Sequence, residues 1–564
     1  MSRSRVRVLV LVVTLLFTVL AMRAVWLGVV RAGWLTSKAD TQHYIPIDTP
    51  AQRGAIVSSD GQTLADDVPS MLITADPRHV DDPKMVADTI ASATGGDEER
   101  RDTMLGLLQS KSAYVILAKQ VSWEKGQYLQ NLNMDGVHFE GTLKRTYPMD
   151  VVAGQVLGLT QTDDGTGIDG LEKKLNGVLA GTAGHRVEVR DQLLGQTVRI
   201  DNIREPKAGK TVTLTINADI QRKMEEILAA TRSEYKAKSA SGIVMDPRSG
   251  AILAIGSVPL VNPNNRAKLK ADSLRLRPVT DAYEPGSVFK VVTVAGAMDE
   301  GLTTPSTLYH VPPFIKVKAG EGQEDYTVGD SHPRYAYEDM TTTQILQKSS
   351  NMGAVTISTG LSKRNSLRKW MARFGFGADT GIDTLGEEAG DLPKTPWNEG
   401  QRVNIPIGQG VTATLLQQAR AYAAIANGGE LVTPHLVRSV DGVATQAGPR
   451  KRILKASTAK QLTGILETVV EPNGTAVSAG LKNYTVAGKT GTAQKVDPTT
   501  QKYSDTLFRS SFIGYVPASK PRLVIAVMVD EPDPVGPHTG GEVAAPAFKS
   551  IADFALGELS IPPG

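Results

Sequence analysis

The sequence predicts an α+β fold in which about five antiparallel strands form a sheet that is covered by helices on both faces. Two pairs of short apolar runs are each joined by a turn that contains proline and serine, which is the composition of a hairpin. A further run of threonine, valine and small residues supplies one more strand, and three segments have the pattern of helices. All of these elements follow residue 206, so we expect the sheet in the second and larger part of the chain.

The individual elements follow from apolar periodicity and turn composition. Strands are predicted at residues 241–246, 251–258, 484–494, 511–516 and 523–529, with a short strand before them at 211–216. Helices are predicted at residues 219–236, 287–301 and 544–556. The first hairpin turns at Pro247-Arg248-Ser249-Gly250 and the second around Ala518-Ser519-Lys520-Pro521.

An uncharged apolar run near the N-terminus predicts a membrane anchor. It starts at Val8 after three arginines and, continued past Arg23 to Val30, has 23 residues, which is about 34 Å of helix. That length crosses the hydrocarbon core of a bilayer, and Arg23 is close enough to one end to snorkel. Basic residues before the span place the N-terminus in the cytoplasm, and the lack of a clean cleavage site favours a retained anchor over a signal peptide. We therefore expect a cytoplasmic tail at residues 1–7, an anchor at 8–30 and the rest of the chain outside.

Charge and composition argue against two kinds of function. Three of the 62 lysines and arginines precede the apolar run, so the exported part carries 59 basic against 59 acidic residues. This balance gives no electrostatic footprint for nucleic acid. The eight histidines are scattered without an H-E-x-x-H motif, so we expect no metal and no cofactor. There is no cysteine and hence no disulfide framework.

Lys290 is a charged residue among apolar neighbours, in the stretch Glu284-Pro285-Gly286-Ser287-Val288-Phe289-Lys290-Val291-Val292. A desolvated amine gives up its proton more readily than a hydrated one. On a helix that starts near Ser287, residues three apart share a face, so Lys290 can reach the Ser287 hydroxyl. The pair predicts a serine nucleophile with a lysine as general base. Taken alone, Ser-x-x-Lys also fits a helix-capping serine followed by a surface lysine.

Two later motifs supply the other parts of an acyl-transfer site. Ser349-Ser350-Asn351 gives S-x-N, and Lys489-Thr490-Gly491 gives K-T-G. The Ser349 hydroxyl can pass a proton between the base and a leaving amine, and the Asn351 amide can hold the lysine or a substrate amide. Lys489 can attract a carboxylate. Backbone N–H groups of the K-T-G strand, with that of Ser287, can form an oxyanion hole.

Gly488-Lys489-Thr490 also resembles the end of a phosphate-binding loop. The first glycine of G-x-x-x-x-G-K-T, however, falls at Asn483, and at Gly209-Lys210-Thr211 it falls at Arg204. Neither segment is therefore predicted to bind a nucleotide.

With these motifs, the chain resembles a class B penicillin-binding protein, a membrane-anchored peptidoglycan D,D-transpeptidase, along most of its length. The resemblance extends to residues 245–254, 408–410, 424–429 and 541–546, and in the polar first part to residues 53–56, 60–61, 64–65, 170–172, 181 and 184. Ser58-Ser59 departs from the family, which usually has Asp-Arg there. The resemblance implies an elongated pedestal of the dimerisation type at residues 41–206 and a penicillin-binding serine-transpeptidase domain at 207–564, behind one transmembrane helix.

The resemblance also implies a role for each site residue. Ser287 attacks the D-Ala-D-Ala carbonyl of a stem peptide, Lys290 acts as the base, and Ser349 and Asn351 complete the proton path. The substrate-binding residues are those of the K-T-G strand, Lys489, Thr490, Gly491 and Thr492. Of these, the side chains of Lys489, Thr490 and Thr492 hold the terminal carboxylate and the Thr492 N–H joins the oxyanion hole. β-Lactams are expected to acylate the same serine.

The implied ligands are peptidoglycan stem peptides and β-lactams, and the implied partners are a SEDS-type glycan polymerase and other division proteins in the bacterial cytoplasmic membrane. The segment 284–290, together with Thr380-Gly381-Ile382-Asp383 before Gly386-Glu387, is closer to the division type of the family than to the elongation type.

Three alternatives remain open on sequence alone. A β-lactamase of class A would need a glutamate to activate water, yet no E-x-x-L-N string lies between Ser349 and Lys489. A β-lactam sensor or a division scaffold would keep an acylatable serine without turnover, although seven residues before the span are too few for an intracellular effector. A D,D-carboxypeptidase would release a shortened peptide without making a cross-link.

Overall fold

The structure, a computed structural model, describes residues 3–34, 44–190, 197–318, 325–363, 366–497, 499–500 and 502–563. The chain forms two compact units whose segments alternate along the sequence. The smaller unit contains Met1–Arg53, Ser70–Leu143 and Ala180–Gly209, and the larger contains Gly54–Pro69, Lys144–Leu179 and Lys210–Gly564. The domain boundary expected near residue 207 stays a prediction.

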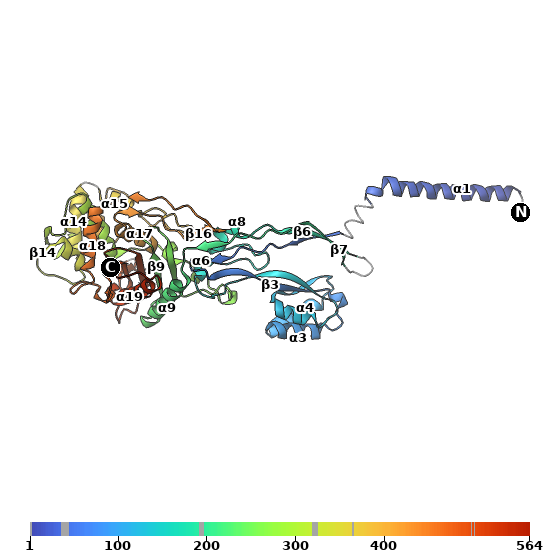
Figure 1. Ribbon diagram of the computed structural model, residues 1–564, viewed down its shortest axis with the longest axis horizontal. Helices are drawn as coiled ribbons and strands as arrows, with labels where there is room; N and C mark the ends of the chain where they lie inside the picture. Colours follow the sequence, from blue (N-terminus) through green and yellow to red (C-terminus); the bar gives the residue numbers. More distant parts are fainter. Residues whose placement is uncertain are drawn as a thin grey trace. The chain divides into compact units, whose positions relative to one another are not determined.

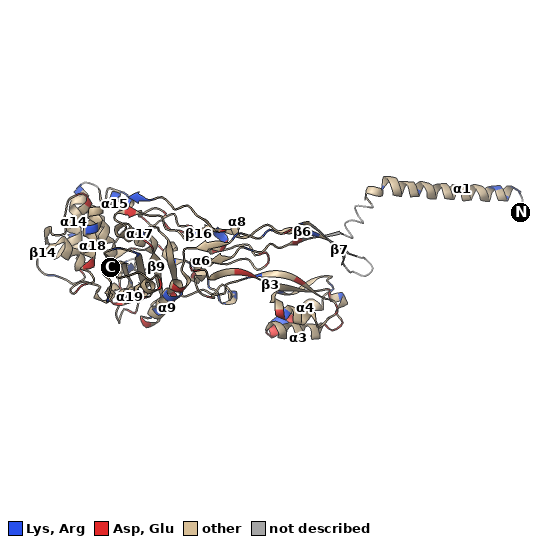
Figure 2. Cartoon of the chain, in the orientation of Figure 1, with Lys and Arg blue, Asp and Glu red and all other residues tan. Residues whose placement is uncertain are grey.

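The smaller unit begins with the apolar helix α1 (Arg3–Val25), which is continued by η1 (Trp26–Val30). In Figure 2, α1 is tan along its middle, the uncharged run from Val8 to Met22 that follows the arginines at its start. Arg3–Val30 is long and apolar enough to cross a membrane, and its 18-residue apolar window is 0% buried. The Arg23 guanidinium lies 5.0 Å from the centre of the Trp26 ring, so cation and aromatic ring pair at one end of the segment. Among the described residues, this is the one helix suited to a single-pass anchor.

The rest of the smaller unit is a three-stranded sheet and a helical lobe. The antiparallel sheet consists of β1 (Tyr44–Thr49), β6 (Gly184–Arg190) and β7 (Thr197–Arg204). The lobe contains α3 (Pro83–Thr94), α4 (Glu98–Leu108), β4 (Val115–Ser122) and α5 (Trp123–Gln130), with parts of β3 (Thr63–Ala75) and β5 (Val137–Thr146). Helix α3 starts where it does because Asp82 accepts hydrogen bonds from two free N–H groups and Pro83 fits the first helical position.

The larger unit is organised by a five-stranded antiparallel sheet, which confirms the strands expected from the sequence. Its order is β10-β9-β21-β20-β19. The strands are β9 (Ser239–Met245), β10 (Ile252–Val258), β19 (Ala487–Val496), β20 (Tyr503–Val516) and β21 (Leu523–Asp530). The sequence neighbours β9 and β10 pair directly, as do β20 and β21, because each pair is a hairpin.

Every residue of the central strands β9 and β21 is buried, since helices cover both faces of the sheet. Alternate residues enter different cores: Ile243 and Met245 face one side of the sheet, and Val244 faces the other. Helices α9 (Ala218–Glu234) and α19 (Gly540–Glu558) pack on the Val244 side, and α17 (Leu415–Ala426) packs on the Ile243 side. In Figure 1, α17 and α19 lie on opposite sides of β9.

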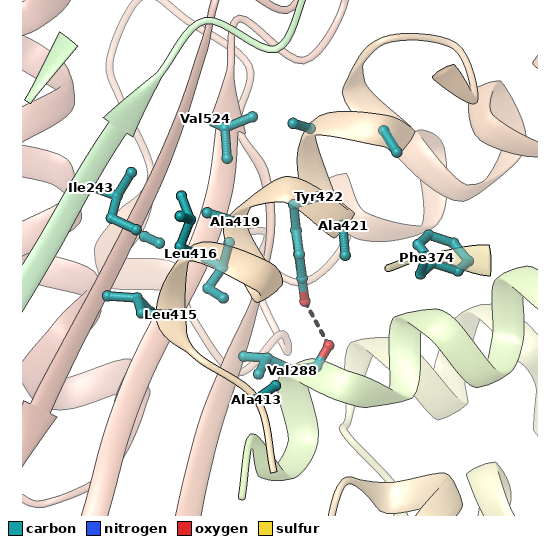
Figure 3. Packing of buried hydrophobic residues seen from close by; sticks show 14 of the residues in the cluster. Ile243, Val288, Phe374, Ala413, Leu415, Leu416, Ala419, Ala421, Tyr422 and Val524 are labelled. Atoms are coloured by element: carbon teal, nitrogen blue, oxygen red, sulfur yellow. Dashed lines mark hydrogen bonds between the residues drawn. The ribbon is translucent and has the colours of Figure 1, made fainter. Parts of the chain in front are cut away.

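Helix α17 also connects the sheet to the turn that contains Ser287. Its residues Leu415, Leu416 and Ala419 pack toward Ile243 and Val524 of the sheet (Figure 3). Two turns further along, the Tyr422 hydroxyl donates a 2.9 Å hydrogen bond to the Val288 carbonyl, drawn as the dashed line in Figure 3. The turn that contains Ser287 is thereby connected to a fully buried strand.

Segments from the first part of the chain complete the larger unit. Strand β2 (Ile56–Val57) pairs in parallel with β8 (Val212–Leu214), which also pairs with β16 (Val437–Val440). The buried Arg145 guanidinium lies 2.7 Å from the Glu172 carboxylate, 3.0 Å from the Gly54 carbonyl and 3.3 Å from the Asp67 carboxylate. A buried cation with this many partners is well compensated.

The remaining elements all belong to the larger unit except η2, and they include the helices that pack around α12. The helices are α6 (Gly154–Leu157), α7 (Gly170–Lys174), α8 (Asn176–Leu179), α10 (Ala271–Leu274), α11 (Arg277–Thr280), α12 (Lys290–Asp299), α13 (Thr342–Gln347), α14 (Asn351–Lys363), α15 (Leu367–Arg373), α16 (Glu399–Asn404) and α18 (Ala456–Glu467). The short strands are β11 (Leu308–Val311), β12 (Phe314–Val317), β13 (Tyr326–Gly329), β14 (Glu338–Thr341), β15 (Glu430–Leu431), β17 (Val443–Ala444) and β18 (Lys451–Arg452). The short 3₁₀ helices are η2 (Pro77–His79), η3 (Arg266–Lys268), η4 (Gly286–Phe289), η5 (Ile405–Ile407) and η6 (Val477–Ala479).

Candidate active site

Ser287 lies in the short 3₁₀ helix η4, immediately before α12, so the α-helix starts three residues later than the sequence predicts. Gly286 has φ +59°, a conformation that glycine adopts without strain, and its N–H donates to the Gly408 carbonyl at 3.0 Å. Tyr283 exchanges two backbone hydrogen bonds with Ala413, at 3.0 and 2.9 Å. The half-buried Ser287 side chain lines an open cleft and has no hydrogen-bond partner among the described residues.

Lys290 is completely buried, with 0% of its surface exposed. Its Nζ donates to the Ser349 carbonyl at 2.6 Å and lies 3.2 Å from Ser349 Oγ. Burial lowers the pKa of Lys290 to about 7, against the opposing field of the Asp330 carboxylate. The expected contact with the Ser287 hydroxyl is not among the hydrogen bonds of the described residues, although the two residues are one turn apart. Lys290 can therefore be an uncharged amine at neutral pH.

The S-x-N motif forms the turn between α13 and α14. Ser349 has φ +59°, an unusual conformation for a residue with a side chain, and it points both its carbonyl and its hydroxyl at Lys290. The Asn351 side-chain amide donates to the Gly329 carbonyl at 2.8 Å. Asn351 thus contacts the end of β13, and no hydrogen bond joins it to Lys290 among the described residues.

Asp330 is a site residue that the sequence analysis missed. It directly follows β13 and accepts hydrogen bonds from the Ser350 hydroxyl at 3.0 Å, from Asn351 N at 2.5 Å and from Met352 N at 3.0 Å. The Arg334 guanidinium lies 2.8 Å from the same carboxylate. No motif marks Asp330, because it sits 19 positions before Ser349 in a polar stretch whose fold is set by long-range contacts.

The K-T-G motif lies on the edge strand β19, next to η4. Lys489 is completely buried, and its Nζ donates to the Thr490 carbonyl at 3.2 Å and to Thr490 Oγ1 at 3.3 Å. Burial, and then the positive field of Lys290, hold the pKa of Lys489 well below its usual range. Thr490 Oγ1 is 2.7 Å from Thr475 Oγ1, another hydroxyl on the cleft wall that no motif indicated. Thr492 Oγ1 accepts a 3.1 Å hydrogen bond from Gly540 N at the start of α19.

A cleft of about 990 Å³ brings the three motifs together. Its walls include Ser287, Ser349, Asn351, Thr490 and Thr492, with Asp330, Gln409 and Thr475 among the further lining residues. Lys290, Lys489 and Gly491 lie behind the wall, where each is buried. Within the described residues, no cluster of histidine, aspartate and glutamate could hold a metal ion.

This arrangement has the components of acyl transfer through serine. An accessible hydroxyl stands one turn from an amine whose pKa is lowered to about 7, and a second hydroxyl contacts that amine. Thr490 and Thr492 of the K-T-G strand line the cleft, and Lys489 lies behind them. A carboxylate can be held there once Lys489 is protonated.

Comparison with known proteins gives two family matches. The profile described as "Penicillin binding protein transpeptidase domain" matches residues 240–553, and the one described as "Penicillin-binding Protein dimerisation domain" matches residues 48–214. The chain is 29% identical to "Peptidoglycan D,D-transpeptidase FtsI" of Escherichia coli K12, over 96% of this chain and 89% of the relative. It is 30% identical to "Penicillin-binding protein PbpB" of Mycolicibacterium smegmatis, over 98% of this chain and 90% of the relative.

The fold also matches solved structures. Penicillin binding protein 3 from Mycobacterium tuberculosis, complexed with aztreonam, superposes with a TM-score of 0.70 at 28% identity, over 92% of this chain and 98% of that one. Penicillin Binding Protein 2X from Streptococcus thermophilus gives a TM-score of 0.73 at 24% identity, over 91% and 80% of the two chains, and so shares the fold.

Proposed function

The chain belongs to the class B penicillin-binding proteins, and on that premise we propose that it is a peptidoglycan D,D-transpeptidase that cross-links stem peptides through an acyl-enzyme on Ser287. The observation that carries this proposal is the state of Lys290, a fully buried amine with a pKa of about 7 in contact with the Ser349 hydroxyl. A lysine whose pKa lies near neutral is unprotonated in a substantial fraction of molecules and is suited to take a hydroxyl proton. The likeness to a relative named peptidoglycan D,D-transpeptidase supports the choice of substrate.

In the first step, Ser287 Oγ attacks the carbonyl carbon of the D-Ala-D-Ala peptide bond while Lys290 Nζ takes the hydroxyl proton. The backbone N–H groups of Ser287 and Thr492 hold the oxyanion. The C–N bond then breaks, and the departing amine receives a proton from Ser349, which regains one from Lys290. D-Alanine leaves, and an ester joins the stem peptide to Ser287.

In the second step, the amine of a neighbouring stem peptide attacks the ester carbonyl. Its surplus proton passes through Ser349 to Lys290, and the C–O bond of the ester breaks. Ser287 Oγ takes the proton back from Lys290, so the enzyme returns to its starting state. The product is a new amide between two peptides, and a β-lactam ring stops the cycle after the first step because its acyl-enzyme is slow to react further.

The opposite wall orients the donor peptide through its terminal carboxylate. Lys489, once protonated, supplies the positive charge, and the hydroxyls of Thr490 and Thr492 donate hydrogen bonds to the carboxylate oxygens. Asn351 can hold a substrate amide when the peptide displaces its contact with Gly329. Gly491 keeps β19 close to η4.

We place the reaction at the outer face of the bacterial cytoplasmic membrane. The arginines at the start of α1, ahead of its apolar run, favour an N-terminus in the cytoplasm and a catalytic unit outside. The likeness to a protein named FtsI supports a role in septal wall synthesis, beside a SEDS-type glycan polymerase and other division proteins.

Product analysis tests the proposed reaction. The full chain, purified in detergent, is given a stem pentapeptide as donor and an amine acceptor, and the products are separated and weighed by mass spectrometry. We expect a cross-linked product together with free D-alanine. A shortened free peptide alone would identify a carboxypeptidase, and the absence of both products would leave a sensor or a scaffold.

Gly491 provides a test of how closely β19 must approach the nucleophile turn. A Cβ on Gly491 would collide with Ser511 Oγ and would lie 3.1 Å from Val288 Cγ1 and 3.3 Å from the Pro285 carbonyl. We expect Gly491→Ala to displace the strand and to lower the acylation rate constant for penicillin at least about tenfold, because displacement of reacting groups by about 1 Å costs up to about a hundredfold. Gly464→Ala is the control, since that position in α18 has nothing within 4 Å. Equal rates in the two variants would show that the strand tolerates the methyl group.

A further inference from the structure

Asp330 accepts hydrogen bonds from three consecutive residues of the S-x-N turn. Its side chain is only 10% exposed, and one carboxylate collects a hydroxyl and two backbone donors from the same turn, those of Ser350, Asn351 and Met352. The two N–H groups belong to the first turn of α14, where helical N–H groups lack partners of their own. An anion at a helix N-terminus is also favoured by the helix dipole. Asp330 therefore ties α14 to the end of β13.

The turn that Asp330 holds determines how Ser349 meets Lys290. Ser349 keeps a left-handed backbone conformation, at φ +59°, which costs free energy unless the surroundings impose it. In this conformation both oxygens of Ser349 contact Lys290 Nζ, at 2.6 and 3.2 Å. Immediately after Ser349, the residues Ser350, Asn351 and Met352 each donate a hydrogen bond to Asp330, and these bonds stabilise the turn.

The charged groups around Lys290 indicate a second role for Asp330, that of a counter-charge. Lys489 on β19 faces Lys290 and bears on it as a like charge when protonated. Asp330 is the charged group whose field favours a protonated Lys290. The Arg334 guanidinium lies 2.8 Å from the Asp330 carboxylate and 3.6 Å from the Glu338 carboxylate. Glu338 also pairs with the Lys348 amine, at 3.0 Å. When Lys290 takes the proton of Ser287, it becomes a buried ammonium, and a buried charge without a counter-charge is costly.

We propose that Asp330 is a positioning residue for acylation, which builds the turn that presents Ser349 to Lys290 and balances the positive charge of Lys290 after that amine has taken the Ser287 proton. The inference rests on the proposed function, because it requires Lys290 to act as the base. It adds a fourth element, the segment after β13, to the three motifs that the sequence shows.

Asp330→Asn removes the negative charge but keeps part of the hydrogen bonding, because asparagine retains one oxygen that can accept from the backbone donors. The full chain in detergent is acylated by penicillin over a range of pH, and the second-order rate constant is followed. For the wild type we expect the rate to rise with pH through about 7, as Lys290 loses its proton. In Asp330→Asn the midpoint of this rise should move to lower pH, because the carboxylate no longer favours the protonated amine. The plateau should fall roughly ten- to hundredfold, the effect of losing one or two hydrogen bonds to a charged group.

Arg334→Gln is the opposite test. It removes the cation that partly neutralises Asp330, so the field of the carboxylate at Lys290 grows and the midpoint should move to higher pH. Asp383→Asn is the matched control, because the Asp383 carboxylate accepts from Leu436 N at 2.6 Å and Val437 N at 2.8 Å and is not part of the cleft wall. It tests the general cost of removing a carboxylate that caps backbone donors, and its midpoint should equal that of the wild type.

Opposite shifts of the midpoint in the two cleft variants, with none in Asp383→Asn, support the inference. The inference would be overturned if the midpoint stayed unchanged in both cleft variants. It would also be overturned if those variants only lost rate and Asp383→Asn lost rate equally. Either result would leave the proposed function standing. A wild-type chain that penicillin does not acylate at any pH would overturn the proposed function and this inference with it. If Asp330→Asn does not fold, as judged by thermal unfolding, the shift in Arg334→Gln decides the question.

Discussion

We expect Ser287→Ala to leave the chain without a penicillin adduct. The full chain, incubated with penicillin and measured by intact-mass spectrometry, should gain the mass of one ligand, whereas the variant should gain none, because the proposed ester forms on the Ser287 hydroxyl oxygen. The variant should fold normally, since the Ser287 side chain has no hydrogen bond to any described residue and the turn is held by the Val288 carbonyl and by Gly286 N.

A matched control comes from another serine on the same wall. Ser331 also lines the cleft, and Ser331→Ala should be labelled to the same extent as the wild type. Labelling of Ser287→Ala equal to that of the wild type would place the nucleophile elsewhere and remove the basis of the proposed mechanism. Complete loss in Ser287→Ala with full labelling of Ser331→Ala would identify the nucleophile.

Lys290→Met is the second variant with a large expected effect. Methionine fills a similar volume without an amine, so the loss of function is separated from the loss of packing in a fully buried site. We expect the acylation rate constant to fall by about 10² to 10⁴, the usual contribution of a general base. The rise of the rate through about pH 7 should disappear with the amine that causes it.

The rate is measured by the appearance of the adduct over time, with thermal unfolding as a check of the fold. Removal of the buried amine should not lower the unfolding temperature much, because a desolvated lysine is itself unfavourable in the core. Lys223→Met on the exposed face of α9 serves as the control for a lysine that carries only a surface ion pair, with Glu226 at 3.2 Å. Normal acylation by Lys290→Met, with the same pH profile, would show that another group takes the Ser287 proton.

The sheet was predictable because its signals are local. The hairpins β9–β10 and β20–β21 each lie within a short stretch, and apolar runs joined by a turn specify such a pair without reference to the rest of the chain. The three motifs were found for the same reason, since each spans four residues or fewer. That they meet in one cleft was an expectation that the geometry supports.

The features that sequence analysis missed depend on contacts between distant residues. Early segments of the chain belong to the larger unit because Ile56 pairs with Val212 and Arg145 contacts Glu172. No sequence pattern around these residues predicts either contact. Asp330 reaches the S-x-N turn only because β13 ends beside it. The start of α12 was misjudged by one turn, since Ser287 to Phe289 continue the 3₁₀ geometry that begins at Gly286. The sequence predicts that the Asn351 amide holds the lysine or a substrate amide, and it gives no sign of the bond that this amide donates to the Gly329 carbonyl.

The two buried lysines have a consequence for how the cleft receives its ligand. Lys290 and Lys489 are both desolvated, and the positive field of Lys290 helps to hold the pKa of Lys489 well below its usual range. We expect a substrate carboxylate beside Lys489 to favour the protonated form of this lysine. Each bound peptide should then be accompanied by the uptake of one proton from water. We therefore expect substrate binding to weaken as the pH rises, because a protonated Lys489 is needed for it. The proposed attack requires Lys290 to be unprotonated, so we expect turnover to fall at both low and high pH.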